Sequence, residues 1–365
     1  MNTLDAKGNK PTELTSFEKK WRESLENGAA QKRYDALRER QALPLKEKLQ
    51  LTEDRIRVWY EAFDGKVAIS YSGGVDSKIL LYLVRRIYPE VPAVFCNTGL
   101  EYPEILHLVK RTPNVRVMRP KMPFHRVIRV HGWPVISKKV ARGLSVLRNP
   151  TDNNQNIYRL YEEGINRFGE PVNGFKVPMR WKFLVKAPFP ISDKCCEIMK
   201  KEPMHRYEKE TGRVQFVGMM ASDSKTREKT YIQTGCNAFD AAHPRSTPLA
   251  FWNKQDIMKC LRDMNIPYAK VYGDIVTNPS TGQLEFTGVQ STGCVFCCFG
   301  LSREDIPNRF QKLYDTHPRL WDYCMNKLGL ADVLEYIREY CPDRSIKGKF
   351  RGEPTNQPTP VELFQ

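Results

Sequence analysis

The sequence of 365 residues contains no run of apolar residues long enough to cross a bilayer. Its first fifty residues lack the apolar core of a secretory signal, which predicts a cytoplasmic protein with no membrane partner. Negative charge is scarce, because 42 Asp and Glu stand against 58 Lys and Arg, a formal charge of +16. This excess favours a polyanionic partner or a phosphorylated ligand.

Two common nucleotide motifs are also missing. We find neither the phosphate loop that ends in Gly-Lys-Ser/Thr nor the dinucleotide fingerprint of three spaced glycines. What the chain does contain is an alternation of short apolar runs and helical periodicity. Strands are expected at Lys66–Ser70, Val91–Cys96 and Val115–Met118, with helices at Ser77–Tyr88 and Pro103–Lys110 between them. This order predicts an α/β fold, with a Rossmann-like parallel sheet flanked by helices.

The remaining chain divides by composition. A polar, partly helical arm is expected at 1–43, an α/β nucleotide-binding domain at 44–270, a basic and aromatic insertion within it at about 145–190, a C-terminal Cys-x-x-Cys and helical region at 271–341, and an irregular tail at 342–365. The insertion mixes bases with aromatic residues, among them Arg148, Tyr158, Arg159, Tyr161, Arg167, Arg180, Trp181 and Lys182. It is either a surface for nucleic acid or a basic lid over a small anionic ligand, and the adjacent Lys138 and Lys139 could line the same entrance.

The turn after the first strand is the most informative segment. It reads Ser72-Gly73-Gly74-Val75-Asp76-Ser77, and its glycines allow successive N–H groups to approach an anion at the start of a helix. Ser72 and Ser77 add hydroxyl donors, while Asp76 is placed either to cap the helix or to hold Mg²⁺ on a pyrophosphate. Thr98 and Gly99 follow the second strand at the same edge of the sheet. We expect this edge to bind phosphates.

Cysteine is abundant and unevenly placed. A chain of this size can bury a sufficient core without disulfide bonds, so the cysteines need another explanation. Cys195-Cys196 are followed, after 97 intervening residues, by Cys294-Val-Phe-Cys297, and in a reducing compartment such clusters favour metal binding. Four soft thiolates suit zinc or an iron-sulfur cluster, and spacing does not separate the two. Cys236 and Cys298 are alternative ligands or sulfur-handling thiols, and with only three ligands one iron would be open. Cys96, Cys260 and Cys324 are expected in the core.

Several motifs together resemble a known family. The glycine loop is similar to the pyrophosphate loop (PP-loop) of the adenine nucleotide alpha-hydrolase superfamily, and more of the chain resembles its phosphoadenosine phosphosulfate (PAPS) reductase-like branch. The matching segments, in the family's order over roughly residues 45 to 340, are Phe95–Glu104, Gly218–Arg227, Pro248–Ile257, Asn265–Tyr268 and Thr292–Cys297. Two positions depart from the family's pattern, since Met220 replaces an Arg and Asp223 replaces a Glu.

The resemblance implies an enzyme that binds ATP or a related adenine nucleotide. Ser72 to Ser77, Thr98 and Gly99 would bind the nucleotide, Asp76 would help to hold Mg²⁺, and Arg227 would contact phosphate. It also implies a 4Fe-4S cluster on Cys195, Cys196, Cys294 and Cys297. The missing Arg at Met220 removes an expected anion contact and counts against recognition of a sulfonucleotide.

The resemblance leaves the activity open between two reactions. A sulfonucleotide reductase of this family carries its nucleophilic thiol in a Glu-Cys-Gly-Leu-His motif, whereas the last cysteine here is Cys341, in Tyr-Cys-Pro-Asp-Arg. We therefore expect an ATP pyrophosphatase that adenylates a substrate and then transfers sulfur, from sulfide or a cysteine desulfurase, onto tRNA, DNA or another acceptor. Reduction of PAPS or adenosine phosphosulfate is the second hypothesis. A non-catalytic, metal-stabilised nucleic-acid-binding module is the third.

Overall fold

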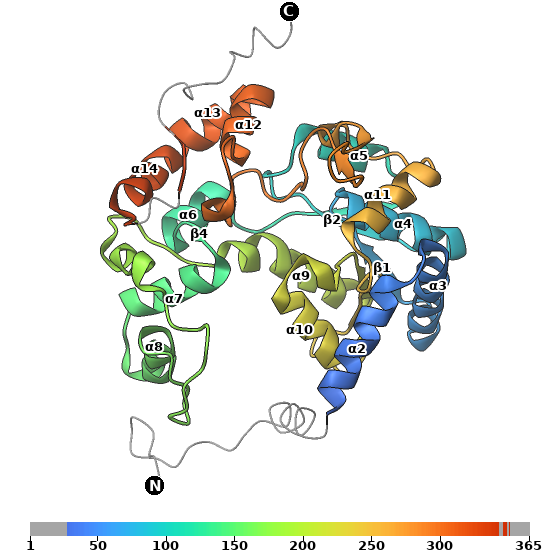
Figure 1. The fold of residues 1–365 in the computed structure, drawn as a ribbon, viewed down its shortest axis with the longest axis horizontal. Coiled ribbons are helices and arrows are strands. Elements are labelled where there is room, and N and C mark those ends of the chain that lie inside the picture. Colours follow the sequence, from blue (N-terminus) through green and yellow to red (C-terminus); the bar gives the residue numbers. More distant parts are fainter. Residues whose placement is uncertain (1–27, 343–345, 349, 351–365) are drawn as a thin grey trace, which may run out of the picture. The chain divides into compact units, whose positions relative to one another are not determined.

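The computed structural model describes residues 28–342, 346–348 and 350. They fall into two compact units, coloured along the chain in Figure 1. The sheet unit holds the described residues up to Lys121 together with Met199–Val295, and the helical unit holds Met122–Ile198 and the described residues from Phe296 onward. This division differs from the expected boundaries. The segment that leaves the sheet unit is wider than the insertion expected at 145–190, and it joins the C-terminal helices in one unit.

The sheet unit is built on six strands in the order β3-β2-β1-β5-β7-β6. All neighbours are parallel except the edge pair β6 and β7. The strands are β1 (Val67–Ser70), β2 (Ala93–Cys96), β3 (Val115–Met118), β5 (Val214–Val217), β6 (Asn237–Ala238) and β7 (Arg245–Ser246). The parallel α/β prediction is thereby confirmed, and the first three strands agree with the expected segments within two residues.

Helices cover both faces of this sheet. Successive side chains along a strand point to opposite faces of the sheet. On one face, Ala68, Val94 and Met118 form a core cluster with Tyr207 of α9 (Glu202–Thr211). Helix α4 (Val75–Ile87) packs on β1 and β5 and in turn contacts α3 and α11. The further helices of the unit are α5 (Pro103–Arg111), α10 (Lys225–Thr234) and α11 (Lys254–Asp263), and a hairpin joins β8 (Ile275–Thr277) to β9 (Leu284–Phe286).

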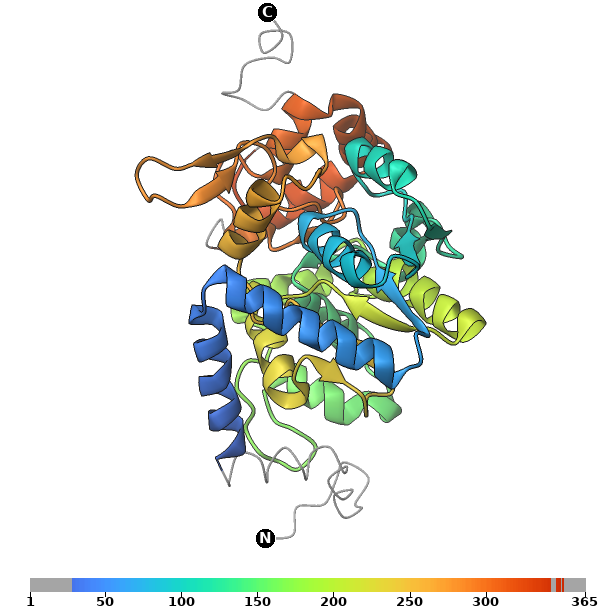
Figure 2. The same cartoon turned by 90° about the vertical axis from the view of Figure 1, so that its right-hand side faces the viewer.

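The N-terminal side of the sheet unit consists of α2 (Ala29–Ala42) and α3 (Leu45–Ala62). Pro44 separates them, because proline has a fixed φ and no backbone N–H to donate to the preceding turn. Figure 2 shows the two blue helices meeting at a corner. Apolar residues recur at helical spacing from Pro44 to about Asp64, and the helix that this pattern predicts is confirmed by α3. Residues 1–27 of the predicted arm, and most of the predicted tail, lie outside the described residues.

The helical unit carries a short parallel pair, β4 (Val135–Ile136) with β10 (Cys298–Phe299). Its helices are α6 (Phe124–His131), α7 (Lys138–Arg148), α8 (Gln155–Glu162), α12 (Arg309–Thr316), α13 (Pro318–Asp322) and α14 (Leu330–Tyr340). The last three of these helices lie within the C-terminal region, 271–341, in which helices were expected. Among the described residues, no helix combines the length and apolar character that a membrane crossing requires.

Candidate functional site

The glycine loop connects β1 to α4, where the sequence placed it. Gly74 is the N-cap of α4, and Gly73 adopts a φ of +75° that disfavours residues with a side chain. A Cβ at Gly73 would lie 2.6 Å from Cγ2 of Ile105, so glycine is required there both by backbone angle and by space. A Cβ at Gly74 would lie 3.0 Å from the hydroxyl oxygen of Thr292. The loop is thus closely surrounded by side chains from distant segments.

The two serines of the loop have different roles. Ser77 is buried, donates its hydroxyl to the Gly74 carbonyl at 2.9 Å and accepts the Ser72 N–H at 3.1 Å. It therefore fixes the shape of the loop. Ser72 is exposed, and its hydroxyl lies 3.1 Å from that of Ser77. Of the two, Ser72 is the hydroxyl that a ligand can reach.

A tyrosine reaches the first helical amide of the loop. The Val75 N–H donates to the Tyr272 hydroxyl at 3.3 Å, and that hydroxyl lies 2.7 Å from Oγ1 of Thr292. Burial raises the pKa of Tyr272 to about 12, so the side chain is a neutral phenol at physiological pH. A phosphate oxygen that takes the Val75 amide has to displace this phenol. Because Thr292 precedes Cys294 by two residues, the contact also joins the loop to the Cys-x-x-Cys segment.

Asp76 faces another carboxylate. Burial first, and then Asp223, raise the pKa of Asp76 to about 6, while Lys254 and Arg227 act in the opposite direction. Asp223 lies in the turn after β5, so two parallel strands bring these carboxylates together at the carboxyl edge of the sheet. Two facing carboxylates flanked by cations have the chemistry to hold a divalent cation and phosphate oxygens.

Arg227 lies on α10, one helical turn after Asp223, with which it forms an ion pair. It remains partly exposed, with 45% of its side-chain surface accessible, so it can reach a ligand. Arg40 of α2 donates to the Tyr231 hydroxyl of α10 at 2.7 Å, and Arg33 donates to the last carbonyls of the same helix. Helix α2 therefore braces the helix that carries Arg227.

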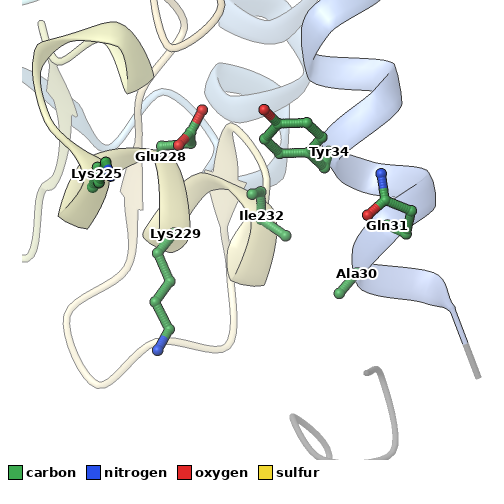
Figure 3. Close-up of a pocket in the computed structure, with 7 residues that line it drawn as sticks. All are labelled: Ala30, Gln31, Tyr34, Lys225, Glu228, Lys229 and Ile232. Atoms are coloured by element: carbon green, nitrogen blue, oxygen red, sulfur yellow. The ribbon is translucent and has the colours of Figure 1, made fainter. Parts of the chain in front are cut away.

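Figure 3 shows the contact between these helices, where side chains of α2 and α10 face one another across a shallow hollow. Ala30, Gln31 and Tyr34 line it from α2, and Lys225, Glu228, Lys229 and Ile232 line it from α10. Arg38 pairs with Glu228 beside this hollow. The hollow belongs to the brace between the two helices.

The predicted binding pair Thr98 and Gly99 forms a turn whose donors are already engaged. Glu101 accepts the Thr98 hydroxyl at 2.6 Å and the N–H groups of Thr98 and Leu100 at 3.2 Å each. Gly99 has a φ of +74°, which directs these amides toward one carboxylate. The N–H groups of this turn are arranged as in an anion site, and the Glu101 carboxylate accepts their hydrogen bonds.

Met220, which stands where the family's pattern has an Arg, is buried in the structure. Its side chain is 1% exposed and lies in the core, so this position presents no group to a phosphate. Asp223, the other departure, accepts the Met220 N–H at 3.2 Å.

The cysteine positions divide between the units. Cys195, Cys196 and Cys297 belong to the helical unit, and Cys294 lies near the end of the sheet unit, three residues before Cys297. None of the ten cysteines, all within the described residues, forms a disulfide. Burial and then the nearby Cys297, Cys324 and Cys195 raise the pKa of the Cys298 thiol. Cys195 and Cys297 therefore lie near one buried thiol, and thiolates are ligands that suit an iron-sulfur cluster or zinc. Among the described residues, no three cysteines have their sulfur atoms within 4.8 Å of one another.

Arg309 lies beside these thiols. It donates to the Cys297 carbonyl at 3.0 Å, and its pKa is raised by Glu304, Cys297 and Cys298 against the opposing effect of burial. This positive charge favours thiolates in the same unit. Sequence reasoning missed Arg309 because it lies 12 residues from Cys297 and outside every motif.

The remaining cysteines are buried or partly buried, and two of them lie near thiols already named, Cys324 near Cys298 and Cys96 near Cys294. Cys236 lies in the sheet unit, where burial raises its pKa and Tyr231, Arg55 and Arg40 are close. Cys260 is fully buried in α11, and Cys324 is fully buried in the helical unit, as expected of core residues. Cys96 is only partly buried, and its thiol donates to the Met199 carbonyl at 3.1 Å.

The basic and aromatic insertion uses part of its composition internally. Trp181 and Tyr161, two of the aromatic residues considered for base stacking, are 1% and 5% exposed and belong to the core of the helical unit. Lys182 pairs with Glu162, and the Arg180 guanidinium lies over the Trp181 ring, 5.2 Å from its centroid. Lys138 and Lys139 begin α7, whose N-cap is Ser137. These buried rings are not available as stacking platforms.

Comparison with known proteins identifies relatives. An uncharacterised protein of Methanocaldococcus jannaschii is 21% identical over 309 residues, which cover 81% of this chain and 57% of that protein. An adenosine 5'-phosphosulfate reductase of Staphylococcus epidermidis is 23% identical over 62% of this chain and 73% of its own. A crystal structure of a PAPS reductase from Candida auris, in complex with phosphate, aligns with a TM-score of 0.34 at 14% identity, covering 71% of this chain and 91% of that one.

The family assignment rests on a broader match. The phosphoadenosine phosphosulfate reductase domain matches residues 66–137 and 159–298, more than half of the chain, and the match includes the glycine loop, the Asp223 turn and all four predicted cluster cysteines. The chain spans only 57% of the length of its Methanocaldococcus relative. The chain belongs to the phosphoadenosine phosphosulfate reductase domain family.

Proposed function

We propose that the protein binds ATP with Mg²⁺ at the glycine loop and adenylates a substrate for sulfur transfer. The observation that carries this proposal is the pair of facing carboxylates, Asp76 and Asp223, beside the loop. Their mutual repulsion is relieved by a divalent cation, and Mg²⁺ binds in proteins through one or two carboxylates together with substrate phosphates. A triphosphate supplies those phosphates.

The proposed reaction is a displacement at the α-phosphorus. An oxygen of the substrate attacks this atom, the bond to the bridging oxygen of the β-phosphate breaks, and pyrophosphate leaves with the electron pair. The substrate then carries AMP on its oxygen, and a sulfur nucleophile displaces the AMP. Arg227 and Lys254 would stabilise charge on the phosphates, and the loop N–H groups would hold the leaving pyrophosphate.

Cys195, Cys196, Cys294 and Cys297 would hold the proposed 4Fe-4S cluster. Such a cluster supplies iron that can bind sulfur or exchange an electron. The sulfur source in this proposal is sulfide or a cysteine desulfurase. The formal charge of +16 supports a nucleic acid acceptor, tRNA or DNA, through phosphate contacts.

The test follows AMP and pyrophosphate from ATP, with tRNA, DNA and sulfide supplied to the anaerobically purified protein. We expect both products in equal amounts from the wild type and neither from Asp76→Asn, while Asp240→Asn, an exposed carboxylate in the same unit, should retain the rate. Turnover by Asp76→Asn at the wild-type rate would contradict the role of this residue.

Sulfonucleotide reduction is the second candidate, and the name of the Staphylococcus relative favours it. It requires release of sulfite from adenosine phosphosulfate or PAPS in the presence of a thiol reductant. Sulfite without pyrophosphate would establish the reductase and refute adenylation. Binding of nucleic acid with neither product would instead favour the non-catalytic module.

A further inference from the structure

A second cluster of potential ligands lies in the sheet unit, away from the glycine loop. His205 and Glu208 are three residues apart on α9 and therefore share one face of that helix. His243 lies in the loop that precedes β7. The neighbouring strands begin here, since Gln215 of β5 pairs with Arg245 of β7, whereas the glycine loop follows the end of β1. The cluster is thus at the amino edge of the sheet and the glycine loop at its carboxyl edge.

The three side chains are arranged closely. One ligand atom from each of His205, Glu208 and His243 lies within 4.8 Å of the other two. The two imidazole rings stack with centroids 3.8 Å apart and planes inclined by 2°. Nδ1 of His243 lies 3.2 Å from Oε2 of Glu208. Among the described residues, this is the one group of three His, Cys, Asp or Glu side chains with such spacing.

A buried side chain orients the carboxylate of this group. Nε2 of Gln215 donates to Oε1 of Glu208 at 2.6 Å, and Gln215 is 5% exposed on β5. This hydrogen bond holds one carboxylate oxygen and leaves Oε2 directed toward His243. Outer-shell partners of this kind orient the ligands of protein metal sites and tune their affinity.

We propose that His205, Glu208 and His243 form a binding site for a divalent transition metal such as Zn²⁺. Two imidazoles and a carboxylate suit zinc rather than Mg²⁺ or Ca²⁺, which prefer oxygen ligands. Zinc bonds of roughly 2.0–2.2 Å place ligand atoms about 3.3–3.6 Å apart in a tetrahedron, so the observed group needs only a small contraction.

The flexible partner in this contraction is His243. Its side chain is 53% exposed on a loop, so its ring can tilt out of the parallel stack and direct a nitrogen at the ion. Three protein ligands leave a fourth position for water. The bound ion would fasten the loop before β7 to α9.

Cobalt(II) is the probe, because its spectrum separates this site from the cysteines. Thiolate ligands give an intense near-ultraviolet charge-transfer band, whereas imidazole and carboxylate ligands give only weak visible bands. We would titrate the full anaerobic protein, the variants His243→Ala and Glu208→Gln, and the control His107→Ala, which removes an exposed histidine in the same unit.

The wild type and His107→Ala should bind one equivalent of cobalt with weak visible bands. His243→Ala should lose at least about 100-fold in affinity for that equivalent, because loss of a ligand exceeds the roughly 10–100-fold effect of an altered outer-shell partner. Zinc should raise the melting temperature of the wild type and of His107→Ala by more than that of His243→Ala, in which only the cysteines remain as zinc ligands. Equal affinity in His243→Ala and the wild type, or an equal loss in His107→Ala, would overturn the proposal.

Discussion

Replacement of Asp76 by Asn is expected to stabilise the ligand-free protein while removing the proposed turnover of ATP. The carboxyl of Asp76 is largely desolvated and faces Asp223, and these two effects raise its pKa from 3.8 to about 6 despite Lys254 and Arg227. At neutral pH the folded protein therefore holds an ionised group in an unfavourable environment. Asparagine has nearly the same shape and carries no charge, so it relieves this repulsion.

The magnitude follows from the pKa. A change from 3.8 to about 6 corresponds to about 3 kcal/mol, at ~1.4 kcal/mol per pKa unit. Between these pH values the folded protein holds a proton that the unfolded chain has released, so the stabilisation by this group is complete below 3.8 and is lost as the pH rises through about 6. The variant should exceed the wild type in free energy of unfolding by about 3 kcal/mol at pH 7, and by about half as much at pH 5.

Urea denaturation at both pH values, without nucleotide and with a chelator present, measures this difference. The exposed Asp240→Asn serves as control and should stay within about 0.5 kcal/mol of the wild type. A variant less stable than the wild type at pH 7, or a difference that does not shrink at pH 5, would refute the reasoning.

Three further predictions concern the loop and the cysteines. Gly73→Ala should abolish ATP binding and destabilise the protein, whereas Gly99→Ala, with a similar φ of +74° but open space, should cost only about 1 kcal/mol of strain; equal losses in urea denaturation would contradict the clash with Ile105. Tyr272→Phe should cost about 1 kcal/mol through its lost hydrogen bonds yet tighten pyrophosphate binding in calorimetry, and weaker binding would show that the phenol assists the ligand. Cys297→Ser should lose bound iron by elemental analysis while the core variant Cys260→Ser keeps it, and iron retained in the first would exclude Cys297 as a ligand.

Local patterns in the sequence predicted the first half of the sheet unit well. The segments from β1 to β3 alternate apolar strands with helical periodicity, and the bounds of each element depend on nearby residues such as Gly74 and Pro103. The glycine loop was found for the same reason, because its conformation depends on six adjacent residues. The short strands β6 and β7, with two residues each, carry too little pattern to be predicted.

Long-range contacts were not predictable in this way. The Tyr272 hydroxyl accepts a hydrogen bond from the Val75 N–H across 197 residues of sequence. No local pattern in the sequence indicates this contact. The role of Lys254 beside Asp76 depends on the packing of α11 against α4. The division into two units was also missed, because residues 122–198 join the segment from Phe296 onward only in the folded chain.

The histidine cluster shows the same limit. His205 and Glu208 could have been seen as a pair on one helix, yet His243 follows Glu208 by 35 residues. Only the pairing of β5 with β7 brings that loop next to α9.

The central claim is that Asp76 and Asp223 hold a divalent cation on a nucleoside triphosphate. Its most direct test is the affinity for ATP with and without Mg²⁺, measured by calorimetry beside adenosine phosphosulfate as competitor. We predict that Mg²⁺ strengthens ATP binding to the wild type, that Asp223→Asn loses this effect, and that adenosine phosphosulfate competes weakly. ATP binding that is independent of Mg²⁺, or tight binding of adenosine phosphosulfate that ATP does not displace, would contradict the claim.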